Sequence, residues 1–448
     1  MNNLANNIAK WLMPVATKFS NQRHLGAIRE GFITIIPLVI VASFFILINN
    51  VILDPENGML ANVVDLSKYS AIGDQVTNGT LGILSILIAF TIAYKLAVSY
   101  DEDGIIPGVM AVAVLVTMLP NAIDIIPEGS EEAVKATGIL SQDQTSATGL
   151  LFAILAALLG TEVFLRLKRK KKLRIKLPDT VPPEVGKSFS ALIPAFLTLT
   201  IFACLVFVSN ALFGFGLQEM VTRAIQAPLN LVVQSRFGIN IIMFFQNLLW
   251  SVGIHGTFVL GPIKDPSLLA AIQENINALK AGTDIPNIVT KPFIDSFAML
   301  GGGGFTIGLV IAIFIASRRS DYREVTKFAA VPGLFNINEP LMFGLPVILN
   351  PILAIPLIIV PIVNLNIAYL ATSLGLISKT VAYIPWTTPP ILSAFLATAG
   401  DWRAAVLAAL LIVISVIIYL PFVMATNRMA ELEKSKSFND DHTVGGTP

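Results

Sequence analysis

VPGLFNINEPLMFGLP, residues 331–346, is the stretch that decides the fold. From Phe328 to Ser378 the only formal charge is Glu339, which lies inside this stretch. An uninterrupted helix is excluded, because proline lacks a backbone donor and clashes with the preceding turn. Broken backbone at membrane depth persists only where protein or a water-filled cavity satisfies its polar groups. The stretch therefore predicts a polar ligand site at the tip of a re-entrant hairpin.

Glu339 has a second interpretation. A carboxylate inside a bilayer costs about 2.5–3.5 kcal/mol on insertion scales, so it usually lines a pathway or meets a partner. The alternative is a carboxylate that snorkels at the end of a span or lies in a loop outside the lipid. The rest of the sequence favours the ligand site.

The composition excludes a soluble globular protein. The chain has 448 residues, of which 54% are hydrophobic and 13% are charged, whereas average proteins carry about 25% charged residues. Several runs approach the roughly 18–20 apolar residues of a spanning helix, which predicts an all-α polytopic membrane protein. The net charge of +1 and a single basic loop give no reason to expect a nucleic-acid partner. Cys204, the lone cysteine, is expected to be a small buried side chain.

The first part of the chain reads as conventional spans. Residues 1–26 predict an interfacial helix, because Trp11 and other apolar residues recur at helical spacing. Spans are expected near 31–49, 81–98, 105–119 and 149–165. The fourth ends in the basic run 166–174, which the positive-inside rule assigns to the cytoplasmic side together with the N-terminus.

The second part is broken by proline and glycine. Pro182 and Pro183 suggest a seam between two halves. A span near 189–212 precedes an amphipathic helix at 217–235, a charge-free run at 237–263 and a polar stretch at 264–291. Residues 293–316 contain Gly301–Gly304, which suit a break where backbone approaches another group closely. A last span is expected at 404–426, followed by a disordered cytoplasmic tail, 427–448.

The number of membrane crossings and the positive-inside rule together constrain the topology of this part. The basic residues after position 317 fall inside only if one segment of 237–304 is re-entrant. The candidates are 238–260 and 291–304, and the sequence does not choose between them.

Several polar residues in the second part are candidate ligands. His255 alone would more often be a satisfied packing residue, but other hydrogen-bonding side chains occur in equally charge-poor segments: Gln246, Asn247, Asn338 and Glu339. Such side chains in an apolar cavity suit a neutral, hydroxyl-rich ligand. Trp386 is either a stacking platform for a sugar ring or an interfacial belt residue. No metal or cofactor is expected, because no ligand-spaced cluster and no nucleotide loop occurs.

Several motifs of the chain resemble those of a known family. Residues 335–344, FNINEPLMFG, closely resemble the signature of enzyme IIC permeases of the bacterial sugar phosphotransferase system, in the lactose/cellobiose/diacetylchitobiose class. Residues 253–256, GIHG, are similar to that family's histidine motif, and QRHL at 22–25 with REGF at 29–32 resembles its N-terminal pattern. The resemblance covers roughly residues 1–430.

The resemblance implies a homodimer of about ten transmembrane helices plus two re-entrant hairpins in the bacterial cell membrane, with both termini cytoplasmic. Its N-terminal half, 27–180, would form the dimer interface, and its C-terminal half, 181–426, would hold a β-linked disaccharide. The sugar's 6-hydroxyl would be phosphorylated by a phosphocysteine on a separate IIB component, with IIA upstream. By position, His255 and Glu339 would be the catalytic residues facing that hydroxyl.

The substrate-binding residues expected beside that pair are Gln246, Asn247, Gly304, Asn338 and Trp386. Two other functions stay open on the residues alone. One is an ion-coupled secondary transporter that releases unmodified sugar, and the other is a membrane scaffold without transport, which the buried polar residues disfavour. The identity of the disaccharide stays undetermined.

Overall fold

The computed structural model describes residues 22–53, 67–125, 132–173, 175, 182–345, 347 and 350–444. Most of the described elements are helices, as expected for an all-α chain. Contacts divide the chain into two compact units. We call Ser20–Gln234 with Gly261–Asp284 the N-terminal unit, and Ser235–Leu260 with the chain from Ile285 onward the C-terminal unit. Most of the predicted interfacial segment 1–26 lies outside the described residues.

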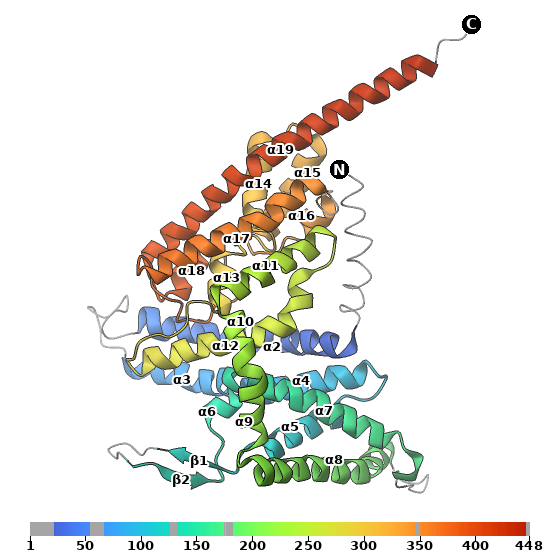
Figure 1. Ribbon diagram of the computed structural model, residues 1–448, viewed down its shortest axis with the longest axis vertical. Helices are drawn as coiled ribbons and strands as arrows, with labels where there is room; N and C mark the ends of the chain where they lie inside the picture. Colours follow the sequence, from blue (N-terminus) through green and yellow to red (C-terminus); the bar gives the residue numbers. More distant parts are fainter. Residues whose placement is uncertain are drawn as a thin grey trace. The chain divides into compact units, whose positions relative to one another are not determined.

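The N-terminal unit is a bundle centred on α4 (Leu84–Val98), which contacts α2 (Arg23–Leu47), α5 (Ile105–Met118) and α7 (Leu150–Lys168) (Figure 1). The side chain of Ile92 on α4 is fully buried. A Cβ atom added to Gly31 of α2 would lie 2.7 Å from Ile92 Cγ1, so glycine at this position permits the two helices to approach closely. Helices are present at all four positions where the sequence predicted spans, with shifted ends, and three of them lie in segments long and apolar enough to cross a membrane.

α8 (Pro183–Phe213) packs on α5 and α7, so it belongs to the N-terminal unit. The sequence predicted a seam between halves at 180 instead. Pro183 is the first residue of this helix, where proline's missing N–H costs nothing, so the proline pair marks the start of α8, while tertiary contacts decide which unit α8 joins. Cys204, predicted to be buried, is exposed on α8.

The remaining elements of the N-terminal unit are short. The loop at 120–146 holds an unpredicted antiparallel pair, β1 (Ala122–Ile125) and β2 (Val134–Thr137), in which Ala122 faces Thr137. The short helices are η1 (Ile48–Ile52), η2 (Ser67–Tyr69), α3 (Ser70–Asn78), η3 (Leu81–Ile83), α6 (Gln142–Thr145), η4 (Ala147–Gly149), η5 (Lys171–Leu173), α9 (Leu217–Val221), η6 (Thr222–Gln226) and α10 (Ala227–Val233). The last three form the helix predicted at 217–235.

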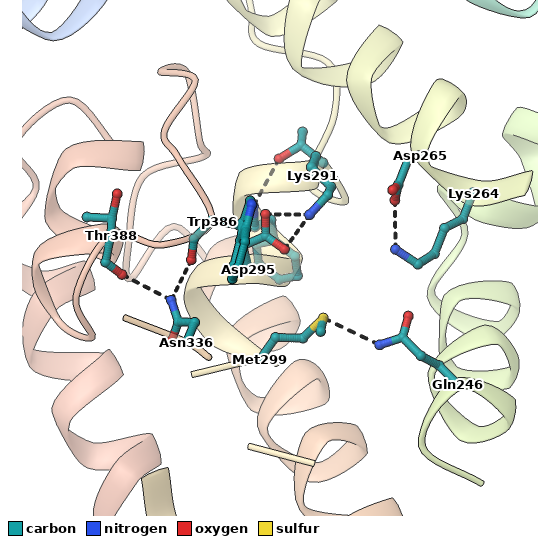
Figure 2. Close-up of polar contacts among 11 residues, drawn as sticks. Gln246, Lys264, Asp265, Lys291, Asp295, Met299, Asn336, Trp386 and Thr388 are labelled. Carbon is teal, nitrogen blue, oxygen red and sulfur yellow. Dashed lines mark hydrogen bonds and ion pairs between the residues drawn. The ribbon is translucent and has the colours of Figure 1, made fainter. Parts of the chain in front are cut away.

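α12 (Gly256–Lys280) extends through most of the stretch that the sequence suggested was merely polar, 264–291. Its residues from Gly261 onward pack in the N-terminal unit, where Leu268 and Ile272 are buried. Lys264 is fully buried as well, and its Nζ lies 2.7 Å from Asp265 Oδ1 (Figure 2). This ion pair compensates the cost of removing the ammonium group from water.

Four helices form the frame of the C-terminal unit: α11 (Arg236–Ser251), α14 (Thr306–Ala316), α17 (Pro351–Ser373) and α19 (Trp402–Val444). α17 contacts α11 and α19, and α14 packs on α19. Inside this frame Asn364 Nδ2 donates to Ser415 Oγ at 2.8 Å, which joins α17 to α19. The other helices are α13 (Lys291–Phe297), α15 (Ser320–Gly333), α16 (Glu339–Gly344) and α18 (Leu392–Ala397).

Six helices of the described chain are long and apolar enough to cross a membrane, or seven if one bent pair is a single span. The six are Arg23–Ile46, Ser70–Val98, Ala147–Lys168, Val185–Phe213, Pro351–Ser373 and Trp402–Glu431. The bent pair, Leu217–Val233 with Arg236–Ser251, turns by 78°. Shorter apolar helices, Ile105–Met118 and Thr306–Ala316, lie beside them in sequence.

α19 continues past its apolar part as far as Val444 (Figure 1). The sequence predicted a disordered tail over 427–448, whereas the described part of that tail is helical. Residues 428–436, RMAELEKSK, are mainly strong helix formers. Asn427 also joins α19 to the end of α14, since its Nδ2 donates to Ala316 O at 2.8 Å.

Asp401 fixes the start of α19. One carboxylate oxygen accepts from Arg403 N at 2.9 Å, which caps the helix, and the other accepts from Ser378 N at 2.8 Å. Burial by itself would raise the pKa of this carboxyl, but hydrogen bonds from Arg403 and Ser378 outweigh it and lower the pKa to about 2. The carboxylate therefore stabilises the fold fully above its unfolded pKa of about 3.9, and that contribution is lost as pH falls through about 2.

We predict that Asp401→Ala lowers the thermal unfolding midpoint of the purified protein in detergent, because the helix loses its cap and Ser378 N–H loses its acceptor. Loss of a cap alone costs about 0.5–2 kcal/mol. Asp284→Ala, at an exposed position, is the matched control and should leave the midpoint unchanged. Equal midpoints for Asp401→Ala and the wild type at neutral pH would contradict the capping role.

Candidate functional site

A glycine loop, Gly301–Gly304, separates α13 from α14 in the C-terminal unit. Gly301, Gly302 and Gly304 have φ angles of 80°, 100° and 81°, a region that side chains rarely adopt. Gly302 also has no room for a side chain, because a Cβ atom at this position would lie 2.6 Å from Asn338 Cγ. The predicted break is therefore present, and the group that it approaches is the 331–346 stretch of the same chain.

Three asparagines and a tyrosine satisfy the backbone of the glycine loop. Asn336 Oδ1 accepts from Gly301 N at 2.7 Å, and Asn338 Nδ2 donates to Gly303 O at 2.8 Å. Asn247 Oδ1 accepts from Gly304 N at 2.8 Å, while Tyr419 Oη donates to Gly304 O at 2.6 Å. All four side chains are buried, so the irregular backbone is paired inside the protein.

Asn336 also holds the loop that carries Trp386. Its Nδ2 donates to Trp386 O at 2.5 Å and to Thr388 O at 3.1 Å (Figure 2). Asn336 itself has a φ of 61°, a left-handed conformation that asparagine tolerates better than most residues. Trp386 itself is 42% exposed.

His255 and Glu339, the two residues that the family resemblance implies would face one hydroxyl, lie close together. His255 Nε2 is 3.4 Å from Glu339 Oε1, and the two side chains are 24% and 42% exposed. His255 directly precedes α12, and Glu339 is the first residue of α16. An imidazole and a partly exposed carboxylate within reach of one hydroxyl can orient it and accept its proton.

Two fully buried polar groups on α11 lack full pairing. Gln246 Nε2 makes only a weak contact with Met299 Sδ at 3.4 Å (Figure 2), and its Oε1 has no partner among the described residues. Trp250 Nε1, one turn further along the helix, is also unpaired within the described structure. A Cβ atom on Gly303 would lie 2.5 Å from that nitrogen. Unpaired buried groups of this kind are costly, and they lie beside the glycine loop.

The structure thus brings most of the predicted site residues to one place and adds others. Three residues expected to bind substrate, Asn247, Gly304 and Asn338, form hydrogen bonds within the protein. Gly304 N donates to Asn247 Oδ1, and Asn338 Nδ2 donates to Gly303 O, so these atoms satisfy the backbone of the glycine loop. Sequence reasoning missed Asn336 and Tyr419. Asn336 stands two residues before Asn338 in the same charge-poor stretch, which was a usable signal, whereas nothing in the last span distinguished Tyr419.

A further pair was missed because the stretch around it was judged only polar. Lys291 Nζ contacts both carboxylate oxygens of Asp295, at 2.6 and 2.5 Å, within the first turns of α13 (Figure 2). Groups of three or more metal-ligating side chains do not occur among the residues that the structure describes.

Comparisons with known proteins identify the family. A family model described as "Phosphotransferase system, EIIC" matches residues 29–361, which include both the histidine motif and the Glu339 stretch. The chain belongs to the phosphotransferase-system EIIC family. The EIIC signature predicted at 335–344 and the polytopic membrane nature of the chain are confirmed together.

Curated EIIC components resemble this chain over nearly their whole length. The lichenan permease IIC component of Bacillus subtilis (strain 168) is 34% identical over 98% of this chain and 96% of its own. The cellobiose-specific EIIC component of Lactococcus lactis subsp. lactis (strain IL1403) is 32% identical over 97% of this chain and 100% of its own. The protein is thus an EIIC permease.

A solved EIIC structure has the same fold. The crystal structure of the transporter ChbC, the IIC component from the N,N'-diacetylchitobiose-specific phosphotransferase system, superposes with a TM-score of 0.88. That chain is 31% identical, and the match covers 95% of this EIIC permease and 98% of ChbC.

We predict that Gly302→Ala destabilises the permease strongly, because the new Cβ atom meets Asn338 in addition to the strained φ. Gly282→Ala is the matched control, since Gly282 also has a positive φ of 65° but nothing within 4 Å of a Cβ atom. The control should cost only the left-handed strain, of order 1–2 kcal/mol. Thermal unfolding in detergent compares the two variants, and equal midpoints would show that the contact with Asn338 is unimportant.

Proposed function

We propose that this permease binds and translocates a β-linked disaccharide of the cellobiose or diacetylchitobiose type. Family membership supports a sugar substrate, and relatives named for lichenan, cellobiose and diacetylchitobiose support the β-linked class. The site has groups that suit such a ligand: Gln246 Oε1 and Trp250 Nε1, which lack partners among the described residues, and the exposed side chain of Trp386.

The proposal includes phosphorylation of the sugar on its 6-hydroxyl by a phosphocysteine of a separate IIB component, which IIA recharges. The His255–Glu339 contact carries this part. In the transfer the hydroxyl proton moves to the Glu339 carboxylate and an O–P bond forms to the sugar. The S–P bond breaks, and the IIB cysteine leaves as thiolate. Cys204 lies exposed on the spanning helix α8, away in sequence from these motifs, and is not the phosphocarrier in this scheme.

The finer architecture is part of the same proposal: about ten spans plus two re-entrant hairpins, both termini cytoplasmic, and a homodimer formed through the N-terminal half. Two broken segments support the hairpins. One is the glycine loop between α13 and α14, and the other is the break at 334–338 between α15 and α16. The basic run 166–174 supports the cytoplasmic assignment of that side. The bilayer is the surrounding partner, and nucleic acid is not one.

An ion-coupled secondary transporter is the competing function. Membrane vesicles loaded with the permease distinguish the two when they receive sugar alone or sugar with phosphorylated IIB. The proposal expects sugar phosphate to accumulate only with phosphorylated IIB. Free sugar accumulating under an ion gradient would contradict it. Binding measurements with a panel of β-linked disaccharides then identify the preferred substrate.

Glu339→Gln should keep much of the sugar affinity and lose phosphorylation-coupled uptake by about 10²–10⁴-fold, because the amide cannot accept the proton. His255→Ala should behave similarly, and the double variant should be no worse than the poorer single one, since members of a working unit are not additive. Rates come from sugar phosphate formed per folded molecule. Wild-type turnover by Glu339→Gln would end the catalytic assignment.

Alanine at Gln246, Asn338 or Trp386 should weaken sugar affinity, with losses of about 1–3 kcal/mol for a hydrogen-bond partner. Asn338→Ala should also lower thermal stability, because Gly303 O loses its donor, whereas Trp386→Ala should not. Affinity is measured by titration of the purified variants. Unchanged affinity in all three would remove them from the sugar site.

A further inference from the structure

The His255 side chain caps the helix that follows it. His255 stands immediately before Gly256, the first residue of α12, and its Nδ1 lies 3.2 Å from Phe258 N. The same N–H is shared with His255 O at 3.0 Å, as is common at helix starts. An acceptor side chain before a helix that receives the third backbone N–H is the usual capping arrangement, here made by an imidazole.

This contact determines which ring nitrogen carries the proton. A backbone N–H can only donate, so Nδ1 must offer its lone pair to Phe258. A neutral imidazole has one protonated and one unprotonated nitrogen, and the partner of one nitrogen therefore sets the state of the other. In a neutral ring this contact places the proton on Nε2, which is the atom that lies 3.4 Å from Glu339 Oε1.

Two aromatic rings hold the imidazole in this orientation. The Phe258 ring stacks on it with centroids 3.6 Å apart and planes 9° from parallel. The Trp250 ring lies with its centroid 4.2 Å away at 47°. Trp250 is only 1% exposed, so its own position is fixed by packing. Rotation about the last torsion of histidine, which would place Cδ2 at the position of Nδ1 and Cε1 at the position of Nε2, is otherwise soft.

Resting on the proposed function, we infer that Phe258 and Trp250 are positioning residues that keep the His255 proton on Nε2 and aimed at Glu339. The imidazole then offers no lone pair to the sugar, because the lone pair of Nδ1 accepts from the helix and Nε2 carries hydrogen. The Glu339 carboxylate is left as the acceptor of the hydroxyl proton. The imidazole fixes the carboxylate's orientation while the phosphoryl group passes from the phosphocysteine sulfur to the sugar oxygen.

The tautomer is measured without sugar or IIB. Histidine labelled with ¹⁵N and ¹³C is incorporated into the permease in lipid bilayers, and the His255 signals are those lost in His255→Gln. Solid-state NMR of the neutral ring should show Nδ1, the nitrogen bonded to Cγ, without hydrogen and Nε2 with hydrogen. Hydrogen on Nδ1 would overturn the inference.

Phe258→Leu tests the positioning role, because it removes the ring but keeps the backbone N–H. The variant should show both tautomers, unchanged sugar affinity, and phosphoryl transfer from phosphorylated IIB slower by about 10–100-fold, the scale of a small misplacement. Phe258→Tyr should restore the wild-type tautomer and rate. Phe237→Leu, which removes a 78% exposed ring from α11, is the matched control and should change neither.

These outcomes separate the inference from the function on which it rests. Wild-type rate and a single tautomer in Phe258→Leu would overturn the positioning role and leave phosphorylation-coupled transport standing. Wild-type turnover in Glu339→Gln would instead overturn the proposed catalytic role, and would do so whatever the NMR spectra show.

Discussion

Backbone that leaves the helical path inside a membrane protein must find its hydrogen-bond partners in the protein, because lipid offers none. The C-terminal unit depends on this constraint at Gly301–Gly304. Asn336, Asn338, Asn247 and Tyr419 supply partners from three different parts of the chain. Pairing one loop therefore brings together α11, the Glu339 stretch and α19, and the sugar-site candidates are assembled as a consequence.

The same constraint leaves some polar groups free and fixes others. Asn247 Oδ1 and Asn338 Nδ2 are paired with the glycine loop, whereas Gln246 Oε1 and Trp250 Nε1 have no partner in the part of the chain that the structure describes. His255 and Glu339 lie at the edge of this network, partly exposed and 3.4 Å apart. A hydrogen-bonded glycine loop beside two partly exposed side chains suits the positioning of a hydroxyl, since small displacements at a reacting centre are costly.

Much of this was readable from the sequence, because charge and helix breakers are local signals. Proline and glycine placed the breaks near 331–346 and at Gly301–Gly304, and motif resemblance paired His255 with Glu339. Three-dimensional requirements were not readable. Asn336 and Tyr419 act through tertiary contacts, α8 joins the N-terminal unit by packing, and α12 buries Lys264 beside Asp265 in a stretch whose composition is merely polar.

The central claim is that the sugar's 6-hydroxyl contacts the His255–Glu339 pair, next to the glycine loop whose backbone is hydrogen-bonded within the protein. A structure of the permease in lipid nanodiscs with a bound β-linked disaccharide tests it most directly. The account predicts the 6-hydroxyl oxygen within hydrogen-bond distance of a Glu339 carboxylate oxygen, with a sugar ring against Trp386. A disaccharide bound with its 6-hydroxyl facing other residues, and Glu339 contacting only protein, would contradict it.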